Sequence, residues 1–274
     1  MLKIRFIMII YYPNPVLLSI GSFEIRYYGL MYLLAFFLSY LIILKLIKIK
    51  NLKIKKEELF DFLFYILVGA IIGARIFYVL FYNLSFYLEN PLKAFAFWQG
   101  GLSFHGGLLG GLLVIFLYSN KKSLPFFTIT DLFSIPLSIG LFFGRFGNFL
   151  NGELYGRVTD VPWAIAFSTA PDKGLLGRHP SQIYEMIKNL IMFFVLFAFY
   201  KKSKRDGNTT ALFFVMYGTM RFLIEFFREP DPQLGFILLG LTMGQLLCIA
   251  MIIIGIALFL NVNVKWSNSK KRAI

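Results

Sequence analysis

Residues 144–156 read GRFGNFLNGELYG and directly follow an apolar run at 132–143. Besides four glycines, the stretch carries a group of polar side chains: Arg145, Asn148, Asn151 and Glu153. An arginine about one turn from the end of a membrane helix is costly unless it is paired, faces a cavity or binds an anion. The alternative is a helix end whose long side chain reaches toward the head-group region. The polar residues and glycines around Arg145 favour the functional interpretation.

The composition indicates an integral membrane protein. Of the 274 residues, 58% are hydrophobic and 19% aromatic, and the mean hydropathy is +0.71. Soluble domains are roughly half apolar. Apolar runs recur along the whole chain with only short breaks, so we expect one polytopic membrane domain over residues 1–274. The N-terminal stretch has no small-residue cleavage site, and we expect it to belong to the mature chain.

The pattern of apolar runs predicts an all-α fold. A membrane-spanning helix needs about 20 mostly apolar residues. Seven segments are candidates: 28–47, 59–82, 104–119, 126–149, 183–200, 210–227 and 236–260. Basic residues gather after the first, third, fifth and seventh segments, which places the N-terminus outside and the C-terminus in the cytoplasm, although Lys3 and Arg5 oppose this orientation. The connectors at about 83–101 and 151–180 are therefore predicted to be extracytoplasmic, the second as a cap.

Charge and missing motifs exclude several classes of function. The formal net charge is +14, but most basic residues lie in these short clusters, so the charge sets the topology and no nucleic-acid partner is expected. The chain has no G-x-S-x-G elbow and no Walker A loop. Two histidines without a cluster of paired aspartates argue against a metal-dependent phosphotransfer site. No metal and no cofactor are expected. The only cysteine, Cys248, lies in an apolar run, which argues against a covalent thioester on the enzyme.

The third segment opens with FHGGLLGG at 104–111. Two pairs of its glycines are four residues apart, a spacing that lets two helix backbones approach closely. Packing does not explain His105 at the head of this helix. This histidine is either a buried structural residue or a group that accepts a proton near physiological pH.

The sixth segment ends in RFLIEFFREPD at 221–231. Arg221, Glu225 and Arg228 are spaced to share one helix face. An internal salt bridge accounts for one arginine, whereas Arg228 and Arg145 still need partners. Because the guanidinium fork suits phosphate oxygens, several arginines at the outer boundary indicate a phospholipid head group. A transporter for an anionic solute or lipid is the alternative, since intramembrane Arg and Glu also mark transport paths.

Four motifs together resemble those of a known enzyme family. They are FHGGLLGG at 104–111, GRFGNFLNGELYGR at 144–157, RHPSQIYE at 178–185 and RFLIEFFREPD at 221–231. In this order and in a seven-helix context, they are similar to the phosphatidylglycerol–prolipoprotein diacylglyceryl transferases of bacteria, over residues 25–244. The second motif is the family signature. Where the family usually has Arg-Trp-Tyr-Gly, this chain has Arg-Tyr-Tyr-Gly at 26–29, which maps the family's functional tyrosine onto Tyr28.

The resemblance implies a reaction and a location. The family moves a diacylglyceryl group from phosphatidylglycerol to the thiol of the lipobox cysteine in a preprolipoprotein signal peptide and releases glycerol phosphate. This is the first step of bacterial lipoprotein maturation. The resemblance also implies a multi-pass protein of the bacterial cytoplasmic (inner) membrane, with membrane lipids as partners and the active site on the extracytoplasmic side.

Site roles follow as hypotheses from the resemblance. The candidate catalytic residues are His105, Arg145, Glu153, Arg221 and Glu225. The two arginines are expected to grip the phosphate, and His105 is a candidate base for the incoming thiol, whose free pKa of about 8.5 leaves it mostly protonated at neutral pH. Each glutamate either orients an arginine or acts as the base. The residues expected to bind phosphatidylglycerol are Tyr28, Arg145, Asn148, Asn151, Gly156 and Arg228. As an alternative to binding the head group, Asn148 and Asn151 fix Arg145 in place.

Overall fold

The computed structural model describes residues 9–20, 23–52, 54–97, 100–229 and 235–265, so Lys3, Arg5, Lys270, Lys271 and Arg272 lie outside the described part. Within it the long helices are α1 (Tyr27–Lys50), α2 (Lys56–Phe81), α4 (Phe104–Lys122), α5 (Phe126–Leu150), α6 (Ser181–Lys202), α7 (Asn208–Glu225) and α8 (Met243–Lys265). They fall on the segments expected from the sequence. Five of them, α1, α2, α5, α6 and α8, are long and apolar enough to cross a membrane.

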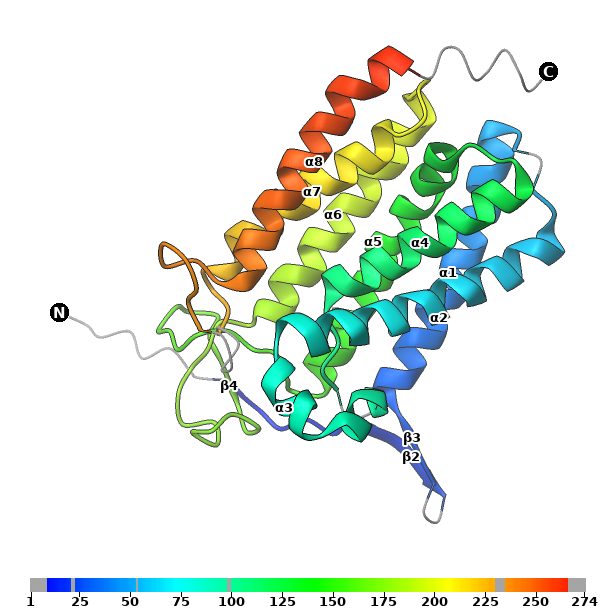
Figure 1. The fold of residues 1–274 in the computed structure, drawn as a ribbon. Helices are drawn as coiled ribbons and strands as arrows, with labels where there is room; N and C mark the ends of the chain where they lie inside the picture. Colours follow the sequence, from blue (N-terminus) through cyan, green and yellow to red (C-terminus); the bar gives the residue numbers. More distant parts are fainter. Residues whose placement is uncertain (1–8, 21–22, 53, 98–99, 230–234, 266–274) are drawn as a thin grey trace.

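Short elements gather at one end of the helix bundle (Figure 1). They are β1 (Ile9–Tyr11), β2 (Val16–Ile20), β3 (Phe23–Arg26), α3 (Leu84–Glu89), the 3-10 helix η1 (Pro91–Phe95) and β4 (Ile165–Phe167). Strand β1 pairs in parallel with β4, which ties the N-terminal segment to the loop after α5. Strands β2 and β3 form an antiparallel hairpin that leads directly into α1. The protein is therefore mostly helical, with small strands at one end that the sequence did not predict.

The last helix begins later than the sequence predicts. The apolar run suggested a helix over 236–260, whereas α8 starts at Met243. Gly240 has a φ of 72°, which belongs to a turn and not to a right-handed helix. The Gln245 N–H donates to Thr242 Oγ1 at 3.3 Å, and the Thr242 N–H donates to Gln245 Oε1 at 3.0 Å. This reciprocal capping box fixes the start of α8.

Glycines let α2 and α4 pack backbone to backbone. A Cβ added at Gly106 would collide with the carbonyl oxygen of Gly73, and a Cβ at Gly110 would collide with that of Gly69. This contact confirms the close approach expected from the four-residue spacing of glycines in α4. It also holds the first turn of α4, which carries His105, firmly against α2.

The variant Gly106→Ala is therefore expected to lower the free energy of unfolding by about 1–3 kcal/mol, because the new methyl group has no space. Gly107→Ala is the matched control, since its Cβ would lie 3.3 Å from the Ala70 carbonyl oxygen and 3.5 Å from Ala74 Cβ. Thermal unfolding of both variants in the same detergent measures the difference. Equal melting temperatures would contradict the packing argument.

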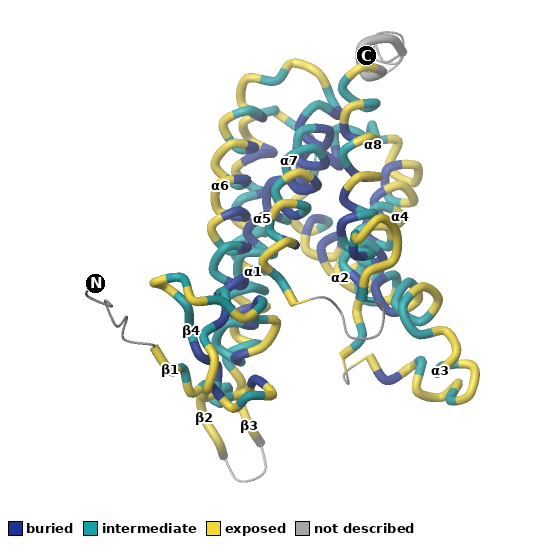
Figure 2. The backbone as a smooth tube through the Cα atoms, turned by 90° about the vertical axis from the view of Figure 1, so that its left-hand side faces the viewer, coloured by how far each residue is buried: buried dark blue, intermediate teal, exposed yellow. Residues whose placement is uncertain are grey.

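Large apolar side chains cover the outer faces of the helices. Exposed examples are Leu33 and Phe37 of α1, Ile72 and Ile76 of α2, Leu109 and Leu113 of α4, Ile187 and Phe194 of α6, and Ile253 and Ile256 of α8. Figure 2 shows exposed positions alternating with buried ones along these helices, so that each helix has an outward and an inward face. Continuous exposed apolar surface of this kind is typical of membrane contact. The chain is accordingly a multi-pass membrane protein.

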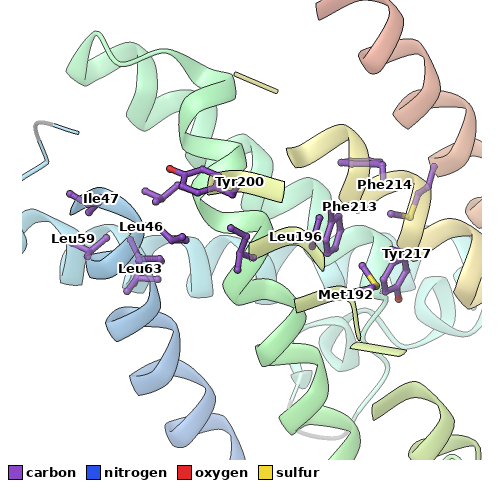
Figure 3. Packing of buried hydrophobic residues seen from close by; sticks show 14 residues of the cluster. Leu46, Ile47, Leu59, Leu63, Met192, Leu196, Tyr200, Phe213, Phe214 and Tyr217 are labelled. Atoms are coloured by element: carbon purple, nitrogen blue, oxygen red, sulfur yellow. The ribbon is translucent and has the colours of Figure 1, made fainter. Parts of the chain in front are cut away.

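Helix α5 lies in the middle of the bundle. It contacts α1, α4, α6 and α7, and it is the most deeply buried of the five apolar helices. A core cluster with members on α1, α2, α6 and α7 packs around it, including Leu46, Leu59, Leu196 and Phe213 (Figure 3). Because α5 is central, Asn148 in its last turn is buried, and Arg145 three residues earlier is half-buried.

Candidate functional site

The site begins where α5 ends. The Gly152 N–H donates to the Phe149 carbonyl at 2.9 Å, and the Glu153 N–H donates to the Asn148 carbonyl at 3.0 Å. Gly152 has a φ of 63°, so these bonds form a Schellman motif with glycine in the left-handed position. The motif turns the chain back over the helix end. It thereby brings the carboxylate of Glu153 beside the side chains of the last helical turn.

A hydrogen-bonded relay connects this carboxylate to Arg145. Arg145 Nη1 donates to Asn148 Oδ1 at 3.3 Å, and Asn148 Nδ2 donates to Glu153 Oε1 at 2.8 Å. Asn151 Nδ2 donates to the same Glu153 oxygen at 3.2 Å. Among the described residues, no carboxylate lies within salt-bridge distance of Arg145. Glu153 therefore orients the arginine through Asn148, and the guanidinium keeps donors for a ligand.

A second group of charges lies between α6 and α7. Arg221 Nε is 3.0 Å from Glu185 Oε1, and Arg221 Nη1 is paired with Glu225. Lys188 Nζ lies 2.6 Å from Glu185 Oε2, and Arg228 Nη1 lies 3.5 Å from Glu225 Oε2. The ion-pair chain thus runs from Lys188 to Arg228. The expected contacts among Arg221, Glu225 and Arg228 are present, although α7 ends at Glu225, so Arg228 reaches this carboxylate from the turn after the helix.

Arg145 belongs to the same electrostatic environment. The positive charges that act on Glu185 come from Lys188, Arg221, Arg145 and Arg228. We call these five residues together with Glu225 the cationic cluster. Four cations share two carboxylates within the cluster, and Glu153 adds a third nearby. One positive charge is left over, on the half-buried Arg145, which has no ion pair among the described residues. Charged side chains inside a membrane usually pair with one another or face a cavity. A phosphodiester supplies one negative charge.

His105 lies in the first turn of α4. Its Nε2 is buried and has no hydrogen-bond partner among the described residues. The neighbouring Phe104 ring stacks on Tyr217 of α7 at a centroid distance of 4.5 Å and so anchors the start of α4. A buried ring nitrogen without a partner is an unusual feature that a bound substrate group would satisfy.

Tyr28 and Gly156 lie at the border of the site, Tyr28 against Gly147 of α5 and Gly156 beside Arg228. The Tyr28 hydroxyl lies 3.1 Å from that of Tyr32, and its ring covers Gly147, where a Cβ would lie 2.5 Å from the ring. Gly156 donates its N–H to the His179 carbonyl at 2.8 Å and bridges to Arg228 in antiparallel fashion. A Cβ at Gly156 would lie 2.8 Å from the His179 carbonyl oxygen. Close backbone packing therefore explains why this position is glycine.

Two further arginines hold the surrounding loops. Arg75 of α2 donates to five backbone carbonyls of residues 93–101 at distances of 2.6–3.2 Å. Arg178 pairs with Asp172 at 2.7 Å and with Glu229 at 3.1 Å, which joins the loop before α6 to the segment after α7. The hydrogen bond from the Arg178 guanidinium lowers the pKa of the Asp172 carboxyl. These arginines fix the loops at the end of the bundle where the site lies.

Three residues that contact these charged side chains were not predicted from the sequence: Glu185, Lys188 and Thr242. Glu185 and Lys188 are almost fully buried, with side chains 2% and 1% exposed. Thr242 Oγ1 donates to Glu225 Oε1 at 2.9 Å. A signal for the first two was present, because an acidic and a basic residue three apart inside an apolar segment mark a buried polar site. No group of three metal-ligating side chains occurs in the described part of the chain.

Comparisons with known proteins agree on one family. A family model described as prolipoprotein diacylglyceryl transferase matches residues 15–261. A relative from Bordetella parapertussis is 45% identical over 253 residues, which cover 91% of this chain and 96% of the relative. Relatives from Geobacter sulfurreducens (44% identical, 89% of this chain and 94% of the relative) and Vibrio parahaemolyticus (46% identical, 89% and 90%) are similar over comparable lengths. All three are named phosphatidylglycerol–prolipoprotein diacylglyceryl transferase.

Proposed function

The chain belongs to the prolipoprotein diacylglyceryl transferase family, and on that premise we propose that it transfers the diacylglyceryl group of phosphatidylglycerol to the lipobox cysteine of a preprolipoprotein signal peptide. Glycerol phosphate is released, and the reaction is the first step of lipoprotein maturation. The observation that carries the proposal is the excess positive charge around Arg145. Its guanidinium binds Asn148, and it has no ion pair with any carboxylate of the described residues, whereas Arg221 has two. That charge is suited to the phosphate of the lipid.

The reaction is a displacement at a primary carbon. The cysteine sulfur attacks the glyceryl carbon that bears the phosphate ester, a C–S bond forms, and the C–O bond breaks with its electron pair staying on the phosphate oxygen. The thiol proton goes to a base. The phosphate gains negative charge as the bond breaks, so cations held in place beforehand stabilise the transition state more than the bound substrate. Arg145 supplies free donors for this purpose, and Arg221, fixed by two carboxylates, adds positive charge behind it.

The remaining predicted roles fit the same site. Arg228, held by Glu225, and the amides of Asn148 and Asn151 are proposed to contact the head group. Tyr28 is proposed to lie against the substrate beside α5, since its ring already covers the last turns of that helix. Gly156 contributes by letting the loop pack closely. Glu225 is proposed to orient Arg221 and Arg228, because its two oxygens are engaged by these arginines and by Thr242.

We further propose that His105 is the base, because its Nε2 is free to accept the thiol proton. In wild type the rate should rise along the acidic limb of the pH profile as the imidazole loses its proton. His105→Gln is expected to lose that limb together with most of its activity. A pH–rate profile of both proteins at saturating phosphatidylglycerol measures this. An acidic limb that is the same in the variant would exclude the imidazole.

Glu153 is proposed to position Asn148 and, through it, Arg145. Glu153→Gln keeps an oxygen acceptor for both asparagine amides, so its kcat is expected to fall by less than about tenfold, the value of roughly one hydrogen bond. Glu153→Ala removes the acceptor and is expected to lose considerably more. If Glu153 were instead the base, the glutamine variant would be as inactive as the alanine variant. Initial rates of the two variants side by side separate these roles.

The proposed topology has seven spans in a single membrane domain over residues 1–274, with the N-terminus outside and the C-terminus in the cytoplasm. The connections α1–α2, α4–α5 and α6–α7 meet at one end of the bundle and carry the lysine clusters, while the strands and the site lie at the other end (Figure 1). The positive-inside rule then places the site and its cap, residues 151–180, on the extracytoplasmic side of the bacterial cytoplasmic membrane.

One experiment tests the function as a whole. The purified protein is incubated with phosphatidylglycerol and a peptide that contains a lipobox cysteine, and the product is analysed by mass spectrometry. A thioether-linked diacylglyceryl peptide and an equal amount of glycerol phosphate are expected. Phosphatidylcholine in place of phosphatidylglycerol is the control. Absence of product, combined with transport of an anionic solute in sealed vesicles, would favour a transporter over the enzyme.

A further inference from the structure

A separate polar cavity lies at the lysine-rich end of the bundle, opposite to the transfer site. Its volume is about 290 Å³, which is room for about ten water molecules. The walls come from the end of α1 and the connection after it, the first turns of α5, the end of α6, and the turn that leads into α7. The cavity therefore opens where the exposed apolar surface gives way to charged loops.

Three cations line this cavity: Lys50, Lys204 and Arg205. The Lys50 ammonium lies 5.0 Å from the centre of the Tyr200 ring and donates to the Ser203 carbonyl. In the described ranges none of the three cations has a carboxylate within salt-bridge distance. Basic pockets between helices at the cytoplasmic face are a typical arrangement for binding anionic lipid head groups.

Two buried hydroxyl groups in the cavity wall lack partners. Tyr200 and Thr209 are 3% and 0% exposed, and neither Tyr200 Oη nor Thr209 Oγ1 has a hydrogen-bond partner among the described residues. Figure 3 shows Tyr200 within the core cluster, between Leu46 and Phe213 in this view. Buried hydroxyls are normally satisfied, and both can donate to an oxyanion. Their position beside uncompensated cations indicates an anionic ligand.

The two carboxylates in the wall are already engaged. Asp131 accepts from the Thr210 N–H and hydroxyl, each at 2.7 Å, and from the Gly207 N–H at 2.8 Å. Asp206 accepts from the Thr128 hydroxyl at 2.8 Å. These contacts tie α5 to the start of α7 and direct both carboxylates toward protein donors, while the three cations still outnumber the two carboxylates. A metal cation would have to displace these bonds and would still meet three positive side chains.

We propose that this cavity binds a phosphate-bearing anion at the lysine-rich membrane face, with Lys50, Lys204 and Arg205 supplying charge and the hydroxyls of Tyr200 and Thr209 supplying hydrogen bonds. The ligand is a phosphate group carried by a lipid or free in solution. The site does not depend on the transfer reaction. Its role is to hold the α1–α2, α4–α5 and α6–α7 ends together on an anionic ligand.

The test uses the full chain in phosphatidylcholine nanodiscs that contain a photo-crosslinking phosphatidic acid, with crosslinked peptides mapped by mass spectrometry. Crosslinks at the cavity walls are expected to fall roughly fivefold for each basic residue lost in Lys204→Ala/Arg205→Ala, and also to fall in Tyr200→Phe/Thr209→Val, which removes both hydroxyls. Lys121→Ala and Ser119→Ala are matched controls, a basic side chain and a buried unpartnered hydroxyl at the same end but outside the cavity.

The outcomes separate the alternatives. Displacement of the crosslinks by millimolar inorganic phosphate would identify a site for free phosphate, and resistance to it a site for a lipid head group; both support the proposal. Equal crosslinking in the cavity variants and the controls, or labelling no stronger than that of a phosphatidylcholine analogue, would overturn it. Lys204 and Arg205 lie on an exposed loop, so Lys204→Ala/Arg205→Ala is expected to fold normally. A loss of crosslinking in this variant is therefore not an effect of misfolding. All four variants are expected to retain diacylglyceryl transfer, which distinguishes failure of this site from failure of the proposed function.

Discussion

Replacing Arg145 by alanine is expected to reduce diacylglyceryl transfer by at least about 10²–10³-fold in kcat, the usual effect of removing one preorganised donor from a developing oxyanion. The guanidinium is bonded to Asn148, and no carboxylate of the described residues pairs with it, so its positive charge is available to the leaving phosphate. Arg221 cannot take over, because Glu185 and Glu225 already hold it. Initial rates of thioether product, measured with the folded variant, give the loss.

The control for this prediction is Arg26→Ala. Arg26 lies just before α1, its side chain is 63% exposed, and it pairs with Glu24 at 3.0 Å. The variant Arg26→Ala therefore removes one arginine from the same end of the molecule without changing the site. Near wild-type rates of transfer are expected. Arg145→Lys keeps the positive charge but loses the forked donors of the guanidinium, and its transfer rate is expected to lie between those of Arg145→Ala and Arg26→Ala. Activity of Arg145→Ala close to that of Arg26→Ala would remove Arg145 from the chemistry.

The long helices were predictable because their signal is local. Some twenty apolar residues in a row are enough to identify a membrane helix, and the helices of the structure fall on the segments expected. The start of α8 was missed since the apolar run continues through the turn before it, although Thr242 and Gln245 have the spacing of a capping box. The pairing of β1 with β4 was not predictable. These strands are three residues long, which is too short to show an alternating pattern of apolar and polar residues, and the two strands lie far apart in the chain.

The contacts of the site also include some that the local sequence predicts and some that it does not. The three- and four-residue spacing of Arg221, Glu225 and Arg228 was sufficient to predict their contacts, even though α7 ends at Glu225. The contact of Arg221 with Glu185 joins two helices, and nothing in the local sequence fixes the rotation of α6 against α7. Glu153 was expected to orient Arg145 or to act as the base, and Asn148 to bind the head group or to fix Arg145. The Schellman turn at Gly152 places Glu153 against Asn148, which in turn binds Arg145.

Glu185→Gln is expected to cause the largest loss of stability among single substitutions in the cluster, about 3–5 kcal/mol, the usual cost of removing one partner from a buried ion pair. Glu185 is the only carboxylate that Lys188 contacts in the described part of the chain, and it also binds Arg221. Without it, Lys188 is a buried cation beside the Tyr217 ring. The melting temperature in detergent and the yield of folded protein measure the loss.

Lys188→Met is the matched control, and it is expected to be much milder than Glu185→Gln. In this variant Glu185 keeps its contact with Arg221, so no buried charge is left unpaired. The double variant Glu185→Gln/Lys188→Met should be more stable than Glu185→Gln alone, because the second substitution removes the isolated cation. If both single variants lost stability equally and additively, Lys188 would not depend on Glu185. The Glu185 carboxylate would then contribute to stability mainly through its contact with Arg221.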